Sequence, residues 1–367
     1  MHIGIDARLT HYRVGGISTY IRRLIGALED LADQQDDFTI FRSRKSQVSS
    51  TTRFLEKPLW TPPHHRLERW ALSAELARFC LDVLHSPDFI PPIHGAKRQV
   101  ITIHDLTFLH YPQHKDSAAL RYYNGQIKVA VKQADHILAV SEATKYDLIE
   151  MLNVPSRKIT VQPHGVDEQF RLLSSQELSV AKNRLNLPEK FILHVGTLEP
   201  RKNIPMLLEA YLQLRNRLPD APALVLVGHI GWLFEETQNH IETLQAQGHP
   251  IFIQGDIEDA LLPAVYNLAS ILVMPSFYEG FGLPALEAMA CGTPVIVSNN
   301  SSLPEVVDTA GILIDAHQPD SLTTALFSVL TDPLQHETMR QLGLERAKLF
   351  TWEQSAQIAL SVYHALG

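Results

Sequence analysis

Two short segments combine charged side chains and glycines in an order that suits an anionic ligand. The first has the sequence EGFGLPALE and runs from Glu279 to Glu287. Its glycines allow the backbone to come close to a ligand, and Pro284 suits the first turn of a helix. Free N–H groups and the helix dipole at such a helix start attract an anion. We therefore predict a phosphate-binding loop formed by Gly280, Phe281, Gly282 and Leu283.

The two carboxylates of this segment are eight residues apart, so they bracket the loop and do not share one helix face. Ionised carboxylates only accept hydrogen bonds, which suits hydroxyl-rich groups. With a diphosphate in the loop, Glu279 would bind a sugar and Glu287 a ribose. The alternative is that these carboxylates only complement a helix dipole.

The second segment follows the apolar run Phe191–Val195 and has the sequence GTLEPRKNIP. Asn203 indicates the start of another helix. Arg201 and Lys202 then lie at the positive end of a helix dipole, which costs a few tenths to about 1 kcal/mol each unless an anion binds there. Arginine offers forked donors and lysine a mobile charge, a combination that suits a diphosphate. The alternative is a solvated pair of cations on a surface turn.

The N-terminal half contains a matching set of residues. Gly15 and Gly16 follow the first predicted strand and precede a helix, so their N–H groups could meet a phosphate from the opposite face of a cleft. They are not part of a G-x-G-x-x-G dinucleotide fingerprint. His104 lies at the carboxyl end of another predicted strand. It forms no familiar metal pattern with His110 and His114, and we reject a zinc site.

Apolar runs alternate with helical patterns along the chain, which predicts parallel sheets covered by helices on both faces. The predicted strands are His2–Ile5, Phe38–Phe41, Val83–His85, Val100–Ile103, His136–Val140, Ile159–Val161, Phe191–Val195, Ala223–Val227, Ile251–Gln254, Ile271–Met274, Val295–Val297 and Gly311–Ile314. The polar stretch 166–189 is typical of a linker. The pattern predicts an α/β fold with two doubly wound, Rossmann-like domains, 1–167 and 168–351, and a terminal helix at about 352–367 that packs back on the first domain.

Composition favours a globular protein of an ordinary kind. The 367 residues carry a formal net charge of -8 and only two cysteines, Cys80 and Cys291. No apolar stretch approaches the ~20 residues of a membrane span. We expect a soluble cytoplasmic protein with reduced cysteines that does not bind nucleic acid. Basic residues are concentrated at 42–69, near Trp60 and Trp70. This stretch predicts peripheral contact with anionic membrane lipid; a solvated loop is the alternative.

Several motifs together resemble glycosyltransferase family 4, whose members have the GT-B fold. The resemblance is carried by HVGTLEPRKN at 194–203, the element from Glu279 to Glu287, SLPEV at 302–306, ITIHDL at 101–106, AVSEATKYDLI at 139–149 and GGI at 15–17. It covers nearly the whole chain. One departure is His164, in a His-Gly-Val-Asp sequence where many relatives have asparagine first.

The resemblance implies two facing domains with the active site in the cleft between them. It also implies retaining transfer of a hexose from a nucleotide sugar to a glycan or lipid-linked acceptor in polysaccharide biosynthesis, without a metal cofactor. UDP-hexose such as UDP-glucose is slightly favoured as the donor over GDP-mannose.

The resemblance also assigns roles to matching residues. Arg201 and Lys202 would hold the diphosphate, and Glu287 the ribose. Glu279 and the backbone of Phe281 and Gly282 would hold the donor sugar. Gly16 would touch the β-phosphate, and His104 would lie beside the transferred sugar. His104, Glu279, Arg201 and Lys202 are the predicted catalytic residues.

Two other functions use the same architecture. A sugar-nucleotide epimerase would need additional acid–base residues, and a non-catalytic sugar-nucleotide-binding subunit would not need the charged residues to remain intact. An oxidoreductase is disfavoured because no dinucleotide fingerprint follows any predicted strand.

Overall fold

The computed structural model describes residues 1–367 apart from 13–14, 33–35, 47–50, 52, 115–116 and 256. The chain divides into two compact units. The N-terminal unit contains Met1–Gly165 and Thr351–Gly367, and the C-terminal unit contains Val166–Phe350. Each unit has its own sheet and its own hydrophobic core.

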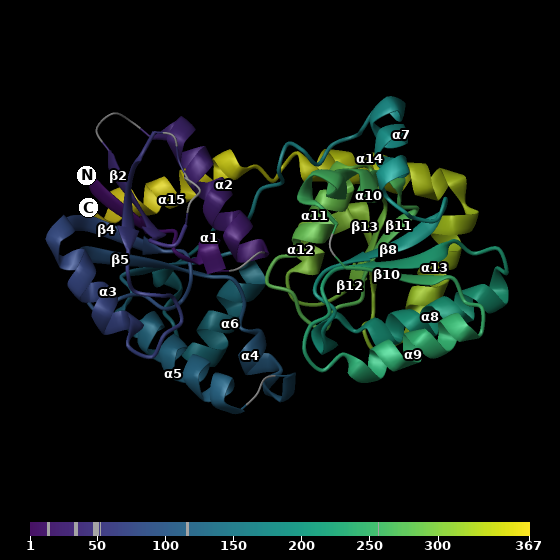
Figure 1. Ribbon diagram of the computed structural model, residues 1–367, viewed down its shortest axis with the longest axis horizontal. Coiled ribbons are helices and arrows are strands. Elements are labelled where there is room, and N and C mark those ends of the chain that lie inside the picture. Colours follow the sequence, from purple (N-terminus) through teal and green to yellow (C-terminus); the bar gives the residue numbers. More distant parts are fainter. Residues whose placement is uncertain (13–14, 33–35, 47–50, 52, 115–116, 256) are drawn as a thin grey trace. The chain divides into compact units, whose positions relative to one another are not determined.

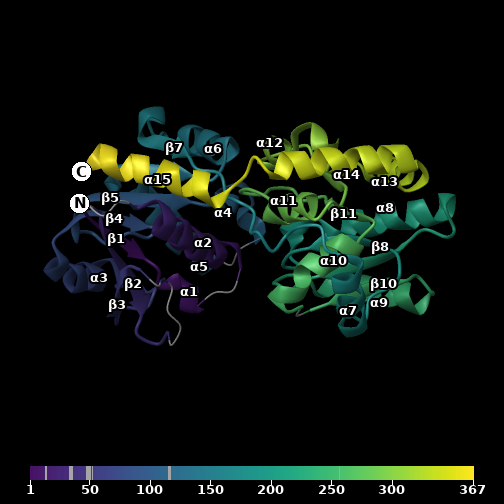
Figure 2. The same cartoon turned by 90° about the horizontal axis from the view of Figure 1, so that it is seen from above.

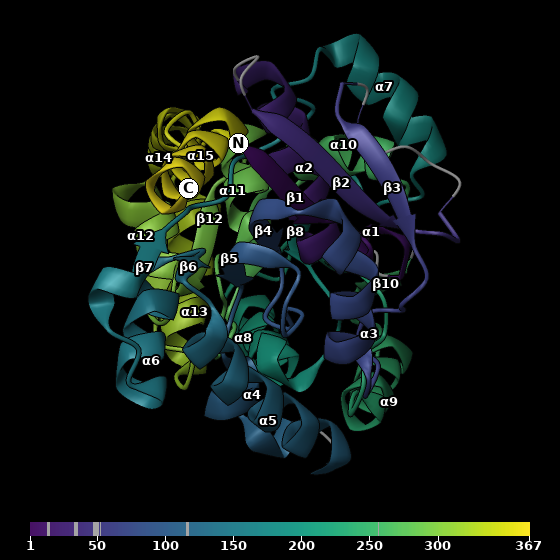
Figure 3. The same ribbon diagram turned by 90° about the vertical axis from the view of Figure 1, so that its left-hand side faces the viewer.

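The sheet of the N-terminal unit is wholly parallel and has the strand order β3-β2-β1-β4-β5-β6-β7, which can be followed in Figure 3. Its strands are β1 (His2–Asp6), β2 (Asp37–Ser43), β3 (Leu55–Leu59), β4 (Leu81–Ser86), β5 (Ala96–Ile103), β6 (His136–Ala139) and β7 (Ile159–Val161). The central strands are buried on both faces, and they are accordingly almost continuous apolar runs.

Helices cover both faces of this sheet. They are α1 (Leu9–Tyr12), α2 (Gly16–Leu31), α3 (Glu68–Leu76), α4 (Thr107–His110), α5 (Ser117–Gln133), α6 (Glu142–Leu152) and α15 (Trp352–Leu366). Helix α15, the last of the chain, packs against α2 (Figure 2), and its residues share one core with β1. On the other face, α3 and α5 contribute to two smaller clusters.

The C-terminal unit, on the right of Figure 1, repeats this plan. Its strands are parallel and have the order β10-β9-β8-β11-β12-β13. The strands are β8 (Phe191–Val195), β9 (Ala223–Val227), β10 (Ile251–Gln254), β11 (Ile271–Met274), β12 (Val295–Ser298) and β13 (Gly311–Ile314). The helices are α7 (Ser175–Arg184), α8 (Ile204–Arg217), α9 (Glu235–Ala246), α10 (Leu262–Leu268), α11 (Leu283–Ala290), α12 (Leu303–Val307), α13 (Pro319–Thr331) and α14 (Pro333–Ala347).

Both sheets reverse their strand order at one point. In the N-terminal unit the reversal lies between β1 and β4, and in the C-terminal unit between β8 and β11. In open parallel sheets, ligands bind outside the carboxyl ends of the strands at such a switch point. The segments that follow these four strands are therefore where a site is expected.

The predicted fold of two doubly wound parallel-sheet units is confirmed, and every predicted strand is present. Two local predictions were incomplete. Strand β3 was not predicted, because its sequence LEKPL has charged residues and a proline in place of an apolar pattern. The stretch 166–189 is not only linker, because it contains α7, which begins with a capping box between Ser174 and Glu177.

Candidate functional site

The segment after β11 forms a loop that ends in the N-terminus of α11. Gly282 precedes the helix with a φ of 105°, a left-handed conformation that favours glycine. Ser302 Oγ lies 2.9 and 2.8 Å from the carbonyl oxygens of Glu279 and Phe281, which share its single hydroxyl proton. Ser301 Oγ accepts the Glu279 N–H at 2.9 Å. Two serines from the segment before α12 thus hold the loop in place.

The segment after β8 brings Arg201 and Lys202 to the same place. Both lie in a short 3₁₀ helix, Pro200–Lys202, directly before α8. The Asn203 side chain anchors this turn by donating to the carbonyls of Pro275 and Ala316, at 3.1 and 2.7 Å. Since β8 and β11 are adjacent strands, their two following loops meet at the switch point.

The predicted catalytic residues of the C-terminal unit form one ion-pair cluster. Lys202 Nζ donates to Glu279 Oε1 at 2.6 Å, and Arg201 Nη1 donates to Glu279 Oε2 at 2.7 Å. Ser276 Oγ donates to Glu279 Oε1 at 2.7 Å. On its other side, Arg201 contacts Glu199 Oε1 through Nε and Nη2, at 3.0 and 2.7 Å. Two cations therefore face two carboxylates.

This cluster is largely removed from solvent, since Lys202 and Glu279 are each 6% exposed. Burial by itself would raise the pKa of Glu279. The charges of Arg201 and Lys202 and the hydrogen bonds from Lys202 and Ser276 outweigh burial and lower that pKa to about 2. Burial also lowers the pKa of Lys202 below its ordinary value. Glu279 is thus ionised at neutral pH and is the anionic partner of both cations.

Glu287 has different surroundings. It lies on α11, and the Tyr266 hydroxyl from α10 donates to its Oε2 at 2.7 Å. Burial raises the pKa of Glu287 to about 7, although the Tyr266 hydrogen bond works in the opposite direction. The two carboxylates of the segment thus differ in charge near neutral pH, which the sequence spacing did not indicate.

The predicted residues of the N-terminal unit lie at the start of α2, beyond β1 and α1, and directly after β5. Gly15 has a φ of 139° and precedes α2, whose first residue is Gly16. His104 follows β5, and its Nε2 lies 3.0 Å from the Pro87 carbonyl. A carbonyl only accepts, so Nε2 carries the proton and Nδ1 is an acceptor in the neutral ring.

Aromatic rings surround His104. Its ring centroid lies 5.0 Å from that of Tyr20 and 5.6 Å from that of His164. Burial lowers the pKa of His104, and burial together with His104 lowers that of His164 well below its ordinary value. His104 is therefore neutral at neutral pH.

Several residues of these arrangements were not singled out in the sequence. They lie far from their partners in the sequence, or their residue types do not by themselves indicate a chemical role. These residues are Glu199, Tyr266, Ser276, Ser301 and Ser302. The SLPEV segment was a motif without an assigned chemistry, and the structure shows that its serine supports the Glu279 loop.

Two family models match the chain in succession. "Glycosyltransferase Family 4" matches residues 14–170, and "Glycosyl transferases group 1" matches residues 175–346. The chain is 34% identical over 309 residues to O-antigen chain mannosyltransferase B of Escherichia coli, covering 83% of this chain and 78% of that protein. It is 26% identical over 388 residues to D-inositol 3-phosphate glycosyltransferase of Kribbella flavida, covering 95% and 90%.

Solved structures agree in fold. Sucrose-phosphate synthase from Thermosynechococcus elongatus has a TM-score of 0.78 at 23% identity, covering 100% of this chain and 99% of that chain. WaaG, a glycosyltransferase involved in lipopolysaccharide biosynthesis, has a TM-score of 0.76 at 15% identity, covering 99% of each. The fold is of the GT-B type. The chain belongs to glycosyltransferase family 4 and is an enzyme of the glycosyltransferase class.

Within the described part of the chain, no helix is long and apolar enough to span a membrane. The same residues include no group of three or more His, Cys, Asp or Glu side chains arranged to hold a metal ion.

Proposed function

We propose that the protein transfers mannose from a nucleotide sugar to a glycan or lipid-linked sugar in polysaccharide biosynthesis, with retention of the anomeric configuration. The match to O-antigen chain mannosyltransferase B supports the sugar and the pathway class. The observation that carries the proposal is the cluster of Arg201, Lys202 and Glu279 at the β8/β11 switch point.

In the proposed reaction, the bond between the anomeric carbon and the diphosphate oxygen breaks. The acceptor oxygen bonds to that carbon on the same face, and the acceptor proton passes to the leaving diphosphate. In this proposal Arg201 and Lys202 donate to the leaving group and stabilise its developing charge, so that a divalent ion is not required. Their clustering with Glu279 supports these roles.

The other predicted residues have binding roles in this proposal. Glu279 accepts hydrogen bonds from the donor sugar, and Glu287 from the ribose. The N–H groups of Gly15 and Gly16 donate hydrogen bonds to a phosphate oxygen, as N–H groups at helix N-termini do. His104 lies beside the transferred sugar, with its neutral Nδ1 as an acceptor.

A panel of nucleotide sugars tests this proposal, with GDP-mannose and UDP-glucose as its main arms. The sequence alone slightly favours UDP-hexose, whereas the 34% identical relative, a mannosyltransferase, favours mannose. We expect turnover of GDP-mannose and an NMR spectrum in which the product keeps the α configuration of the donor. Turnover of UDP-glucose alone would show that the transferred sugar is glucose and not mannose. A product with the β configuration would overturn the proposed retention.

We further propose that the N-terminal unit touches anionic membrane lipid through part of the stretch 42–69. Some basic side chains of this stretch have partners within the protein and are not available to lipid. Arg42 forms an ion pair with Glu56, and Arg69 donates to the Pro91 carbonyl. Exposed cationic and apolar side chains remain: Arg44, Lys45, Arg66, Leu67 and Trp60, with Trp70 just beyond the stretch. Residues 47–50 and 52 lie outside the described part of the chain.

A further inference from the structure

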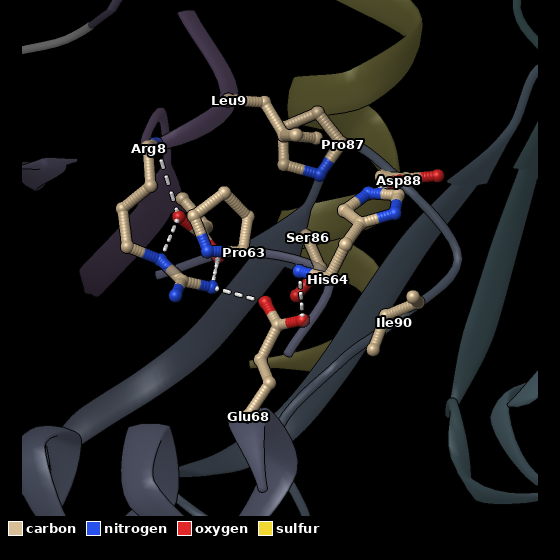
Figure 4. A pocket seen from close by; sticks show the side chains of 10 residues that line it. Arg8, Leu9, Pro63, His64, Glu68, Ser86, Pro87, Asp88 and Ile90 are labelled. Atoms are coloured by element: carbon tan, nitrogen blue, oxygen red, sulfur yellow. Dashed lines mark hydrogen bonds and ion pairs between the residues drawn. The ribbon is translucent and has the colours of Figure 1, made fainter. Parts of the chain in front are cut away.

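The switch point of the N-terminal unit contains a small pocket lined by charged residues, shown in Figure 4. Asp6, Arg8 and Leu9 line it from the end of β1, and Ser86, Pro87 and Asp88 line it from the end of β4. Since β1 and β4 are the strands at which the order reverses, this is where the sheet offers a ligand site. The site described above for the C-terminal unit occupies the corresponding place after β8 and β11.

The cation of the pocket is already saturated. Arg8 is 1% exposed and donates to both oxygens of Asp6, to Glu68 Oε1 and to the Thr61 carbonyl, at 2.7 to 2.8 Å. Three carboxyl groups, those of Asp6, Glu68 and Asp88, line the pocket with this single guanidinium. An added phosphate would meet like charges, whereas a hydroxyl group would meet acceptors.

His64 is held in an unusual position at this pocket. Its backbone φ is 60°, a conformation that residues other than glycine rarely adopt and that recurs at functional sites. Its N–H donates to Glu68 Oε2 at 2.5 Å, and its Nε2 lies 2.8 Å from Asp88 Oδ2. Its Nδ1 is buried and has no hydrogen-bond partner among the described residues. A buried polar atom of this kind indicates a missing partner.

The pocket adjoins the residue expected beside the transferred sugar. Pro87 lines the pocket, and its carbonyl accepts the His104 proton. The pocket has room for roughly one water-sized group, which is the size of a hydroxyl. A hydroxyl carries one proton and can donate it either to the Asp88 carboxylate or to the unpartnered Nδ1 of His64, which are both acceptors because the His64 Nε2 proton goes to Asp88. The apolar side chains of Leu9, Pro63 and Ile90 form the remaining wall.

We propose that this pocket, through Asp88 and His64, binds one hydroxyl group of a neutral acceptor sugar and selects against a phosphate at that position. The inference rests on the proposed transferase function and names the chemical class of its acceptor. Asp88 and His64 act in binding only and exchange no bond with the sugar.

The test measures transfer and donor hydrolysis separately. Acceptor probes are octyl glycosides of mannose, glucose, galactose and N-acetylglucosamine, each in neutral and 6-phosphorylated form. We expect Asp88→Asn to raise KM for the preferred neutral glycoside about tenfold, the size of one hydrogen bond to a charged group. Donor affinity and the slow hydrolysis of the donor by water should stay unchanged, because the donor does not occupy this pocket.

Asp147→Asn is the matched control. Asp147 pairs with His110 at 2.8 Å, the same distance as the Asp88–His64 pair, in the same unit but outside the pocket. His64→Asn is the second variant, since asparagine tolerates the left-handed backbone. This variant should also raise KM for the preferred neutral glycoside. It provides the measurement if Asp88→Asn does not fold.

Three results would overturn the inference. The first is transfer to phosphorylated glycosides only, or to no neutral glycoside. The second is an equal KM for the Asp88 and Asp147 variants. The third is a parallel loss of hydrolysis and transfer in both pocket variants, which would leave these residues only a structural role. Failure of the proposed function looks different, because the wild-type protein would then bind and hydrolyse no nucleotide sugar.

Discussion

Lys202 Nζ and Glu279 Oε1 lie 2.6 Å apart, although their positions in the sequence differ by 77 residues. Both side chains are 8% exposed, so this ion pair is buried. A second Lys–Glu pair of the same length, Lys348–Glu345, lies on the surface of the same unit with side chains 68% and 71% exposed. The two pairs have the same donor–acceptor distance, but the second is exposed and, among the described residues, lacks the further partners that Glu279 has in Arg201 and Ser276, so it serves as the control for an ion pair without that environment.

Glu279→Gln should lower the free energy of unfolding by about 3–5 kcal/mol, because it leaves Lys202 as a buried charge with a weaker partner. Glu345→Gln should change it by less than about 1 kcal/mol, since exposed pairs contribute little. Urea unfolding of both variants measures this difference. Equal urea midpoints for the two variants would contradict the larger contribution of the buried Lys202–Glu279 pair to stability. The pKa of Glu279 is lowered to about 2, so its contribution is present above pH 4.5 and should disappear as the pH falls toward 2.

The pH dependence of donor binding should depend on Glu287. Its pKa is raised from 4.5 to about 7, so the folded protein holds this proton more tightly than the unfolded chain. Stability from this group is therefore lost as the pH rises from about 4.5 to about 7, and Glu287→Gln should flatten the curve. An ionised Glu287 is the better acceptor for a ribose hydroxyl, so affinity for GDP should rise as the pH passes through the folded-state pKa of about 7.

Tyr266→Phe provides the companion measurement for Glu287. It removes a hydrogen bond that lowers the Glu287 pKa, so it should shift the rise in GDP affinity to higher pH. An affinity curve that is flat between pH 5 and pH 8 in the wild-type protein would speak against Glu287 as the ribose ligand.

Transfer should persist in excess EDTA. In the proposed reaction, Arg201 and Lys202 of the β8–α8 segment stabilise the leaving diphosphate, which is the usual role of a divalent ion. The measurement compares initial rates with and without chelator, after dialysis of the protein against chelator. Abolished transfer that magnesium or manganese restores would refute metal independence.

Binding to lipid vesicles should require negative charge on the vesicle. Each basic contact is worth about 1 kcal/mol at an anionic surface and is screened by salt, so the protein should sediment with phosphatidylglycerol vesicles and dissociate as salt rises. Replacing both Arg44 and Trp60 with alanine should weaken sedimentation, because these two exposed side chains stack at 3.9 Å. The control is Trp232→Ala, an exposed tryptophan of the C-terminal unit. Equal sedimentation with neutral vesicles would favour the solvated-loop alternative.

The fold was predictable from the sequence because central parallel strands must be apolar on both faces. Strand β3 escaped for the converse physical reason. It is an edge strand, where Pro58 and charged side chains are tolerated since one side of the strand makes no ladder bonds. Helix α7 buries only Ala181, so its sequence lacks an apolar stripe, and only the Ser174–Glu177 capping box marked it.

The site was predictable where charge and backbone chemistry coincide at helix starts, as at Arg201, Lys202 and Glu279. Pairings between distant segments were not, because spacing in the sequence carries no information about which loops a sheet brings together. Tyr266 on Glu287 and Ser302 under the Glu279 loop are examples. The expected cleft between the two domains, and the joint action of Gly16 and His104 with the C-terminal residues, stay predictions.

The most direct test of the account combines donor binding and transfer for Glu279→Ala, with Glu345→Ala as the control. Calorimetric titration with GDP-mannose and a transfer assay to a mannose-terminated glycoside give the two readings. The account predicts that Glu279→Ala, in protein that remains folded by circular dichroism, loses transfer by at least about 100-fold, the scale of one electrostatic contact in a transition state. Glu345→Ala should match the wild-type protein in both readings. Near-normal transfer by folded Glu279→Ala would contradict the central claim that the β8/β11 switch point is the donor site.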